Sequence, residues 1–129
     1  MPAANWTTRI GVSIGTVCGV TCSALSVLFV VANPYAPMSI HEGGVWIVII
    51  PGLGVCGALA AVAAVRQRPR ALLILFFLSF VPFGLYLFLT IPRVFGWIGA
   101  SHLGYLVASL VLQSSAARDG RTRRTWSHR

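Results

Sequence analysis

The chain has 129 residues, of which 57% are hydrophobic and only 9% charged, and its mean hydropathy is +0.82. Soluble domains carry roughly 25% charged residues, and a chain this short has too much surface for its volume to hide so many apolar side chains from water. This composition argues against a soluble enzyme, a DNA-binding domain or a disordered segment. Lipid is the expected solvent for most of the chain.

Four long stretches without charged side chains follow one another along the sequence: residues 10–32, 45–65, 71–90 and 94–113. Each reaches the length of about 20 residues that a helix needs to cross a hydrocarbon core of about 30 Å. A lone strand cannot satisfy its backbone hydrogen bonds in lipid, so each stretch must be a helix. The sequence therefore predicts an all-α integral membrane bundle of four transmembrane helices, arranged as two helical hairpins.

The first predicted helix, residues 10–32, is longer than the roughly 7–15 apolar residues of a signal-peptide core, so we expect it to be retained. It has a small residue at every fourth position: Gly11, Gly15, Gly19 and Ser23. The fourth predicted helix repeats this pattern with Gly96, Ala100, Gly104 and Ala108. Small residues favour helix contact in lipid because they let two backbones approach closely. We expect these two helices to pair, within one chain or across a dimer.

Two prolines lie inside predicted spans, Pro51 in the second and Pro82 in the third. Each removes one backbone donor and frees a carbonyl about one turn earlier. We expect a kink at both positions, serving as a fixed structural feature. The alternatives are a moving hinge or a carbonyl that coordinates an ion.

The distribution of arginine predicts the orientation, because cytoplasmic loops are enriched in Lys and Arg. Placing the N-terminal segment, residues 1–9, in the cytoplasm puts nine of the ten arginines on that side and leaves only Arg93 on the other. Both termini are therefore predicted to be cytoplasmic, with residues 114–129 as a flexible basic tail. Abundant Arg, Ala, Val and Gly without Lys indicate a GC-rich bacterial genome, and hence a bacterial inner (plasma) membrane.

The loops contribute two further sets of charges. Six cytoplasmic arginines are candidates for contact with anionic lipid headgroups, at about 1 kcal/mol each near the surface: Arg66, Arg68, Arg70, Arg121, Arg123 and Arg124. The orientation rule accounts for these arginines, so no nucleic-acid partner is expected. On the other side, Glu42 and Arg93 would form an exposed pair worth about 0–1 kcal/mol, or Glu42 would cap the second helix.

His102 is the one ionisable residue of conventional interest inside a predicted span, and such residues often mark function. Cys22 is expected at a similar depth on the first helix, and Tyr105 lies close by in sequence. We expect a neutral histidine that is hydrogen-bonded within the bundle, where a leucine would leave its partner unpaired. The alternative is a proton-carrying, ligand-binding or metal-binding role, the metal being a soft ion such as Cu(I) or Zn. The cysteines lack Cys-x-x-Cys spacing and suit packing as small hydrophobes, so no metal or other cofactor is expected.

No paired carboxylate, nucleophilic triad or phosphate-binding loop is present in the sequence, so we expect no enzymatic activity. We expect a small multi-pass membrane protein that acts by interaction, as an accessory or structural subunit of a larger complex or as a self-associating bundle. Its partners would be the lipid bilayer and other membrane protein chains. The alternative is a minimal transporter or channel for a small solute or ion. It would have to be oligomeric, because four short helices with few polar residues enclose little of a pore.

Overall fold

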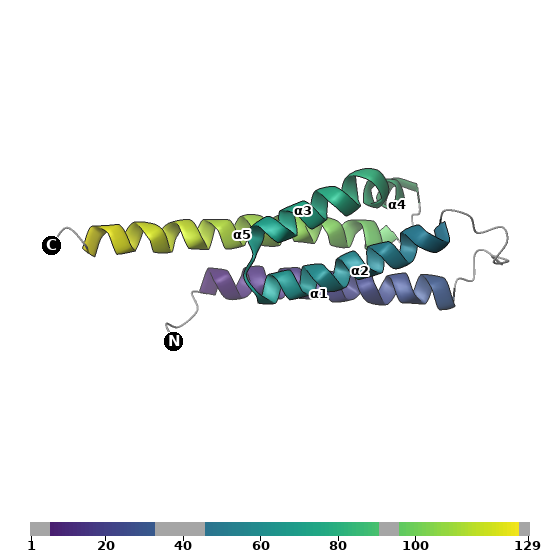
Figure 1. Ribbon diagram of the computed structural model, residues 1–129, viewed down its shortest axis with the longest axis horizontal. Helices are drawn as coiled ribbons and strands as arrows, with labels where there is room; N and C mark the ends of the chain where they lie inside the picture. The colour runs from purple at the N-terminus through teal and green to yellow at the C-terminus, as the bar shows by residue number, and fades with distance from the viewer. Residues whose placement is uncertain (1–5, 33–45, 91–95, 127–129) are drawn as a thin grey trace.

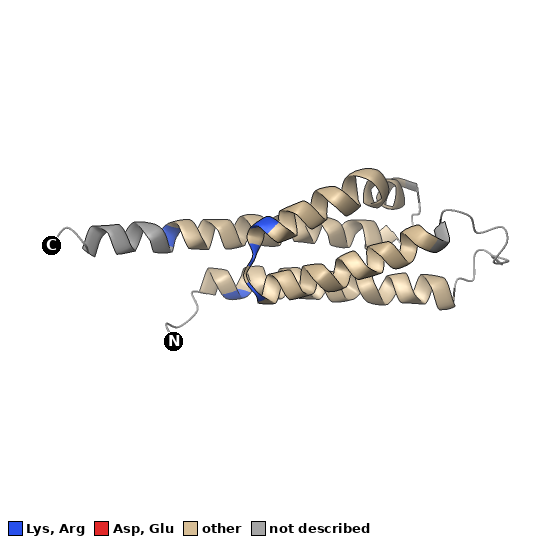
Figure 2. Ribbon diagram, in the orientation of Figure 1, with Lys and Arg blue, Asp and Glu red and all other residues tan. Residues whose placement is uncertain are grey.

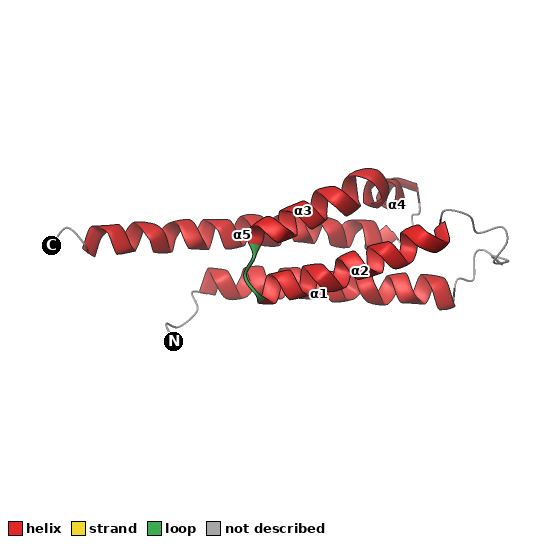
Figure 3. Ribbon diagram, in the orientation of Figure 1, coloured by secondary structure: helices red, strands yellow, loops and turns green. Residues whose placement is uncertain are grey.

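The computed structural model describes residues 6–32, 46–90 and 96–126, and nearly all of them are helical (Figures 1 and 3). The elements in chain order are α1 (Trp6–Val31), α2 (Trp46–Val65), α3 (Pro69–Ser79), the π-helical turn η1 (Phe80–Gly84), α4 (Leu85–Thr90) and α5 (Gly96–Trp126). Because α3, η1 and α4 are continuous, these elements make four helical rods. The predicted all-helical class is confirmed.

The rods run back and forth along one long axis and form a bundle (Figure 1). Helix α1 packs on both α2 and α5, while α3 packs on α2 and α5 from the other side. The turn η1 and helix α4 also lie against α5. Helix α5 therefore packs extensively on every other element of the bundle except α2.

Three helices in the described part are long and apolar enough to cross a membrane: Trp6–Val31, Val48–Val65 and Pro69–Leu89. They indicate a membrane protein and are compatible with a multi-pass arrangement. Helix α5, which contains the predicted fourth span, is not among them. His102, Tyr105 and Gln113 make this span more polar than the others.

The bundle has an apolar core, but its outer surface differs from that of a soluble protein. Several serines and His102 are buried inside the bundle, whereas its outer surface displays bulky apolar side chains such as Val20, Val55, Leu78 and Leu110. A water-soluble protein would expose its polar groups and bury its apolar ones. Polar side chains turned inside, with valine and leucine outside, are the pattern expected for a lipid solvent.

Helix α5 extends well past the boundary predicted near Gln113, into the segment expected to be a tail. In Figure 1 its C-terminal end projects beyond the N-terminal end of α1. Two serines at this point fit a helix because their hydroxyls donate to carbonyls one turn back, Ser114 to Val111 at 2.8 Å and Ser115 to Leu112 at 2.9 Å. Alanine and arginine, which are good helix formers, follow them.

The two prolines have different effects. Pro51 lies inside α2, which remains one continuous α-helix from Trp46 to Val65. Pro82 lies inside η1, where the backbone N–H of Leu85 donates to the carbonyl of Phe80, five residues earlier. A wider π turn is one way for a helix to accommodate a missing donor. At Pro82 the helix therefore changes its geometry, as expected.

Candidate functional site

The small-residue strip of α1 lies at the centre of the bundle and faces two helices. A Cβ atom added at Gly15 would lie 2.7 Å from the Cβ of Ala64 on α2 and 3.2 Å from that of Ala108 on α5. Toward the N-terminus, Gly11 faces Leu112 of α5. The contact between the first and fourth predicted spans therefore occurs within one chain.

The other half of the strip turns toward α2. A Cβ atom at Gly19 would lie 2.5 Å from the carbonyl oxygen of Gly57 and 2.7 Å from the backbone nitrogen of Ala61. One turn later, the hydroxyl of Ser23 donates to the carbonyl of Gly54 at 2.8 Å. Here two backbones meet with no side chain between them, which requires glycine.

On α5 the predicted small residues have different surroundings. Gly104 faces Cys18 of α1 so closely that no Cβ atom fits there. Gly96 and Ala100 are half-buried, and the tightest approach in that stretch is made by Gly99, which the sequence analysis did not single out. A Cβ atom at Gly99 would lie 2.5 Å from the carbonyl oxygen of Gly84 in η1.

Four buried polar side chains come from α1 and α5: Cys22 and Ser26 from α1, and His102 and Tyr105 from α5. We call them the polar junction. His102 is fully buried, and its Nδ1 lies 2.6 Å from the carbonyl oxygen of Ile98. A carbonyl can only accept, so Nδ1 carries the hydrogen. In a neutral imidazole Nε2 is then an acceptor, and it faces the Cys22 thiol at 3.9 Å.

The polar junction connects all four rods. The Cys22 thiol also lies 3.5 Å from the carbonyl oxygen of Leu53 on α2, so its single hydrogen has two acceptors available. The ring of Tyr105 packs edge-on against His102 with centroids 5.2 Å apart. A Cβ atom at Gly84 of η1 would lie 3.5 Å from the His102 ring. The three residues singled out from the sequence, Cys22, His102 and Tyr105, are thus brought together.

The polar junction offers few ligands for a metal ion. Within the described ranges, no group of three or more His, Cys, Asp or Glu side chains is placed to hold a metal. Cys22 and His102 would supply one sulfur and one nitrogen, whereas structural zinc sites use four ligands. The arrangement is suited to holding helices together by hydrogen bonds.

Two hydroxyls of the polar junction, those of Tyr105 and Ser26, are buried without a hydrogen bond of standard geometry, and the polar group that interacts with each is the Cys22 thiol, a weak acceptor. A buried polar group without a partner costs about 1–3 kcal/mol. We therefore expect Tyr105→Phe to leave the free energy of unfolding unchanged or to raise it by about 1 kcal/mol. Unfolding of the purified protein in mixed detergent micelles measures this difference. A clear loss of stability in Tyr105→Phe would mean that the hydroxyl has a partner.

The remaining predicted residues lie apart from the polar junction. Glu42 and Arg93 fall outside the described ranges. Arg66, Arg68 and Arg70 lie at the connection between α2 and α3, with exposed side chains. The other three predicted lipid-contacting residues belong to the C-terminal part of α5: Arg121, Arg123 and Arg124.

Comparison of the chain with protein-family models, with curated proteins and with solved structures finds no match.

Proposed function

We propose that the protein crosses a bacterial inner membrane four times, with both termini in the cytoplasm and α5 providing the fourth span. Support comes from the arginines of the described part, which all lie toward one end of the bundle (Figure 2). They occur on the N-terminal part of α1, at the α2–α3 connection and on the C-terminal half of α5. Arginine concentrated on one side is the usual mark of the cytoplasmic face. Ser101, His102, Tyr105 and Ser109 of α5 are buried inside the bundle, which offsets their cost in lipid.

This topology has a direct test. Reporter domains fused after Gln67 and after Arg129 should report a cytoplasmic location, and one inserted near Ser39 should report the opposite side. The expected result follows from the nine-to-one arginine distribution. A cytoplasmic signal from the Ser39 fusion would contradict four spans with both termini inside.

We further propose that the protein acts by interaction, as an accessory subunit or a self-associating bundle in the membrane. The observation that carries this proposal is how the interior polar groups are used. The hydroxyls of Ser79 and Ser101 donate to carbonyls four residues earlier in their own helices, at 2.6 and 2.7 Å, and that of Ser109 donates across to the Pro69 carbonyl of α3 at 2.8 Å. Hydroxyls already bonded to the backbone are unavailable to line a path for a solute.

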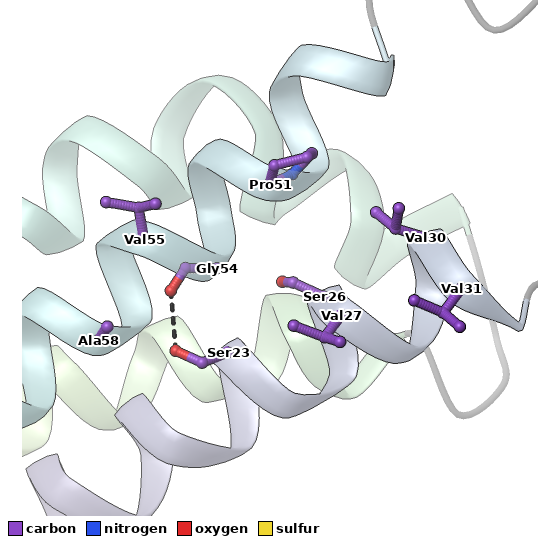
Figure 4. Close-up of a pocket in the computed structure, with 9 residues that line it drawn as sticks. All are labelled: Ser23, Ser26, Val27, Val30, Val31, Pro51, Gly54, Val55 and Ala58. Atoms are coloured by element: carbon purple, nitrogen blue, oxygen red, sulfur yellow. Dashed lines mark hydrogen bonds between the residues drawn. The ribbon is translucent and has the colours of Figure 1, made fainter. Parts of the chain in front are cut away.

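A surface for a partner helix is present on the seam between α1 and α2. A groove of about 340 Å³ lies there, and its lining is almost entirely apolar (Figure 4). Its lining includes the small residues Ser23, Gly54 and Ala58, and the Ser23 hydroxyl is already bonded to the Gly54 carbonyl. Small residues along a groove allow another helix to approach closely in lipid. We propose that a transmembrane helix of a partner chain packs here.

The test uses one variant inside the groove and one outside. Val55 lines the groove, whereas Val107 is exposed on α5 and does not line it. Purification in mild detergent should recover a second membrane chain, or a second copy, in fixed stoichiometry. Val55→Trp should release it and Val107→Trp should retain it. Loss from neither variant would contradict the groove as the interface, and solute flux by the protein alone in liposomes would favour the transporter alternative.

A further inference from the structure

A second groove lies between α2 and α3 and differs from the first in its charge. It has a volume of about 330 Å³, and its apolar walls include Leu59 and Val62 from α2 with Ala71 and Ile74 from α3. Arg66 and Arg68 line it as well, and no acidic residue does. Since these arginines lie at the connection, one end of an otherwise apolar groove is strongly basic.

The connection that carries these two arginines has a defined backbone geometry. The N–H of Arg68 donates to the carbonyl of Ala63 at 2.9 Å, and the N–H of Gln67 donates to that of Ala64 at 2.9 Å. With Gln67 at a φ of 52°, this is the Schellman arrangement that ends many helices. Helix α3 begins immediately afterwards at Pro69. The two arginines therefore lie on either side of a turn of defined geometry. The apolar part of the groove starts at this turn and continues between α2 and α3.

We propose that this groove binds one anionic phospholipid, with its phosphate between Arg66 and Arg68 and an acyl chain along the apolar walls. Guanidinium groups bind phosphate through paired, charge-assisted hydrogen bonds. Arginines at the end of a spanning helix lie at the level of lipid headgroups, and residues one to two turns deeper lie at the level of the acyl chains. The order of charge and apolar surface along the groove therefore matches that of a phospholipid. This site does not depend on the proposed partner chain.

The matched variants are two double substitutions and one blocking substitution. Arg66→Gln with Arg68→Gln removes the proposed phosphate ligands. Arg9→Gln with Arg118→Gln removes the same charge from exposed positions that do not line the groove. Ile74→Trp obstructs the apolar wall without changing charge, and Ile74 is exposed enough to accept the larger ring. Helicity and thermal unfolding in lipid-free detergent check that each variant folds.

Native mass spectrometry from micelles containing phosphatidylglycerol or phosphatidylcholine measures the binding. We expect one phosphatidylglycerol per chain, bound more tightly than phosphatidylcholine. Loss of Arg66 and Arg68 should weaken it about 25-fold, since each arginine contributes about 1 kcal/mol near an anionic surface and 1.4 kcal/mol is a factor of ten. Ile74→Trp should also weaken it, and the Arg9 and Arg118 variant should remain within about twofold of the unmodified protein.

Two results would overturn the proposal. Equal weakening by both double substitutions would show diffuse attraction to the basic end of the bundle. Binding that Ile74→Trp leaves unchanged, and that inorganic phosphate displaces completely, would show an anion site without an acyl chain.

Discussion

Gly19→Leu is expected to be the most destabilising single substitution in the bundle, lowering the free energy of unfolding by at least about 3 kcal/mol. Even the first added carbon would lie within 2.5–2.7 Å of two backbone atoms of α2, in Gly57 and Ala61. Backbone atoms cannot rotate away as a side-chain end can, so α1 and α2 must move apart. Overpacking a core usually costs about 1–3 kcal/mol, and separating two helices adds the loss of their contacts.

Gly52→Leu is the matched control. Gly52 lies on α2, and a Cβ atom added there meets nothing within 4 Å. Both variants make the same chemical change inside a helix, so their difference isolates the contact between α1 and α2. Unfolding in mixed detergent micelles should separate them clearly. Equal stability of the two variants would mean that α1 and α2 do not approach each other closely at Gly19.

His102→Ala is expected to cost about 3 kcal/mol, because removing a fully buried ring leaves a cavity between α1, η1 and α5. His102→Gln should come within about 1 kcal/mol of the unmodified protein, since its amide supplies one donor for the Ile98 carbonyl and one acceptor for Cys22. The same unfolding measurement checks both variants. A glutamine variant that assembles normally but loses flux or bound metal would contradict the structural role.

His102→Leu tests an expectation drawn from the sequence, namely that leucine leaves the histidine's partner unpaired. The structure provides other bonds for both partners. The Ile98 carbonyl lies inside α5, where helical carbonyls accept from the backbone four residues later, and the Cys22 thiol has Leu53 as a second acceptor. Leucine should therefore recover most of the stability that alanine loses. A leucine variant as unstable as alanine would mean that the hydrogen bonds of His102 outweigh its packing.

The helical class and the approximate positions of the helices could be predicted because the need to satisfy backbone hydrogen bonds in lipid leaves few choices. The polar cluster could be anticipated in part, since matched depth on antiparallel helices brings Cys22 near His102. The sequence could not predict which face of α1 contacts which helix. A glycine strip is equally suited to any neighbour, and Gly19 proved to face α2, whereas Ala108 and Gly15 meet across α1 and α5.

Helix ends and local distortions were less predictable. The boundary expected at Gln113 marks where apolar residues end, which need not be where the helix ends. Pro51 and Pro82 present the same missing donor, yet only the second lies in a π turn. The signal for Gly99 was present as a glycine close to Gly96, but its partner lies in that distorted turn, which periodicity does not reveal.

The position of α1 between α2 and α5 bears on how the protein is made. The ribosome synthesises α1 first and α5 last, so α1 and α2 can associate early through Gly19 and Gly57. The side of α1 that carries Gly11 and Cys22 acquires its neighbours on α5 only after α5 has been synthesised. During that interval this side faces lipid or the insertion machinery. Assembly of the bundle therefore closes with α5, and a chain terminated before residue 96 would leave exposed the surface of α1 on which α5 packs.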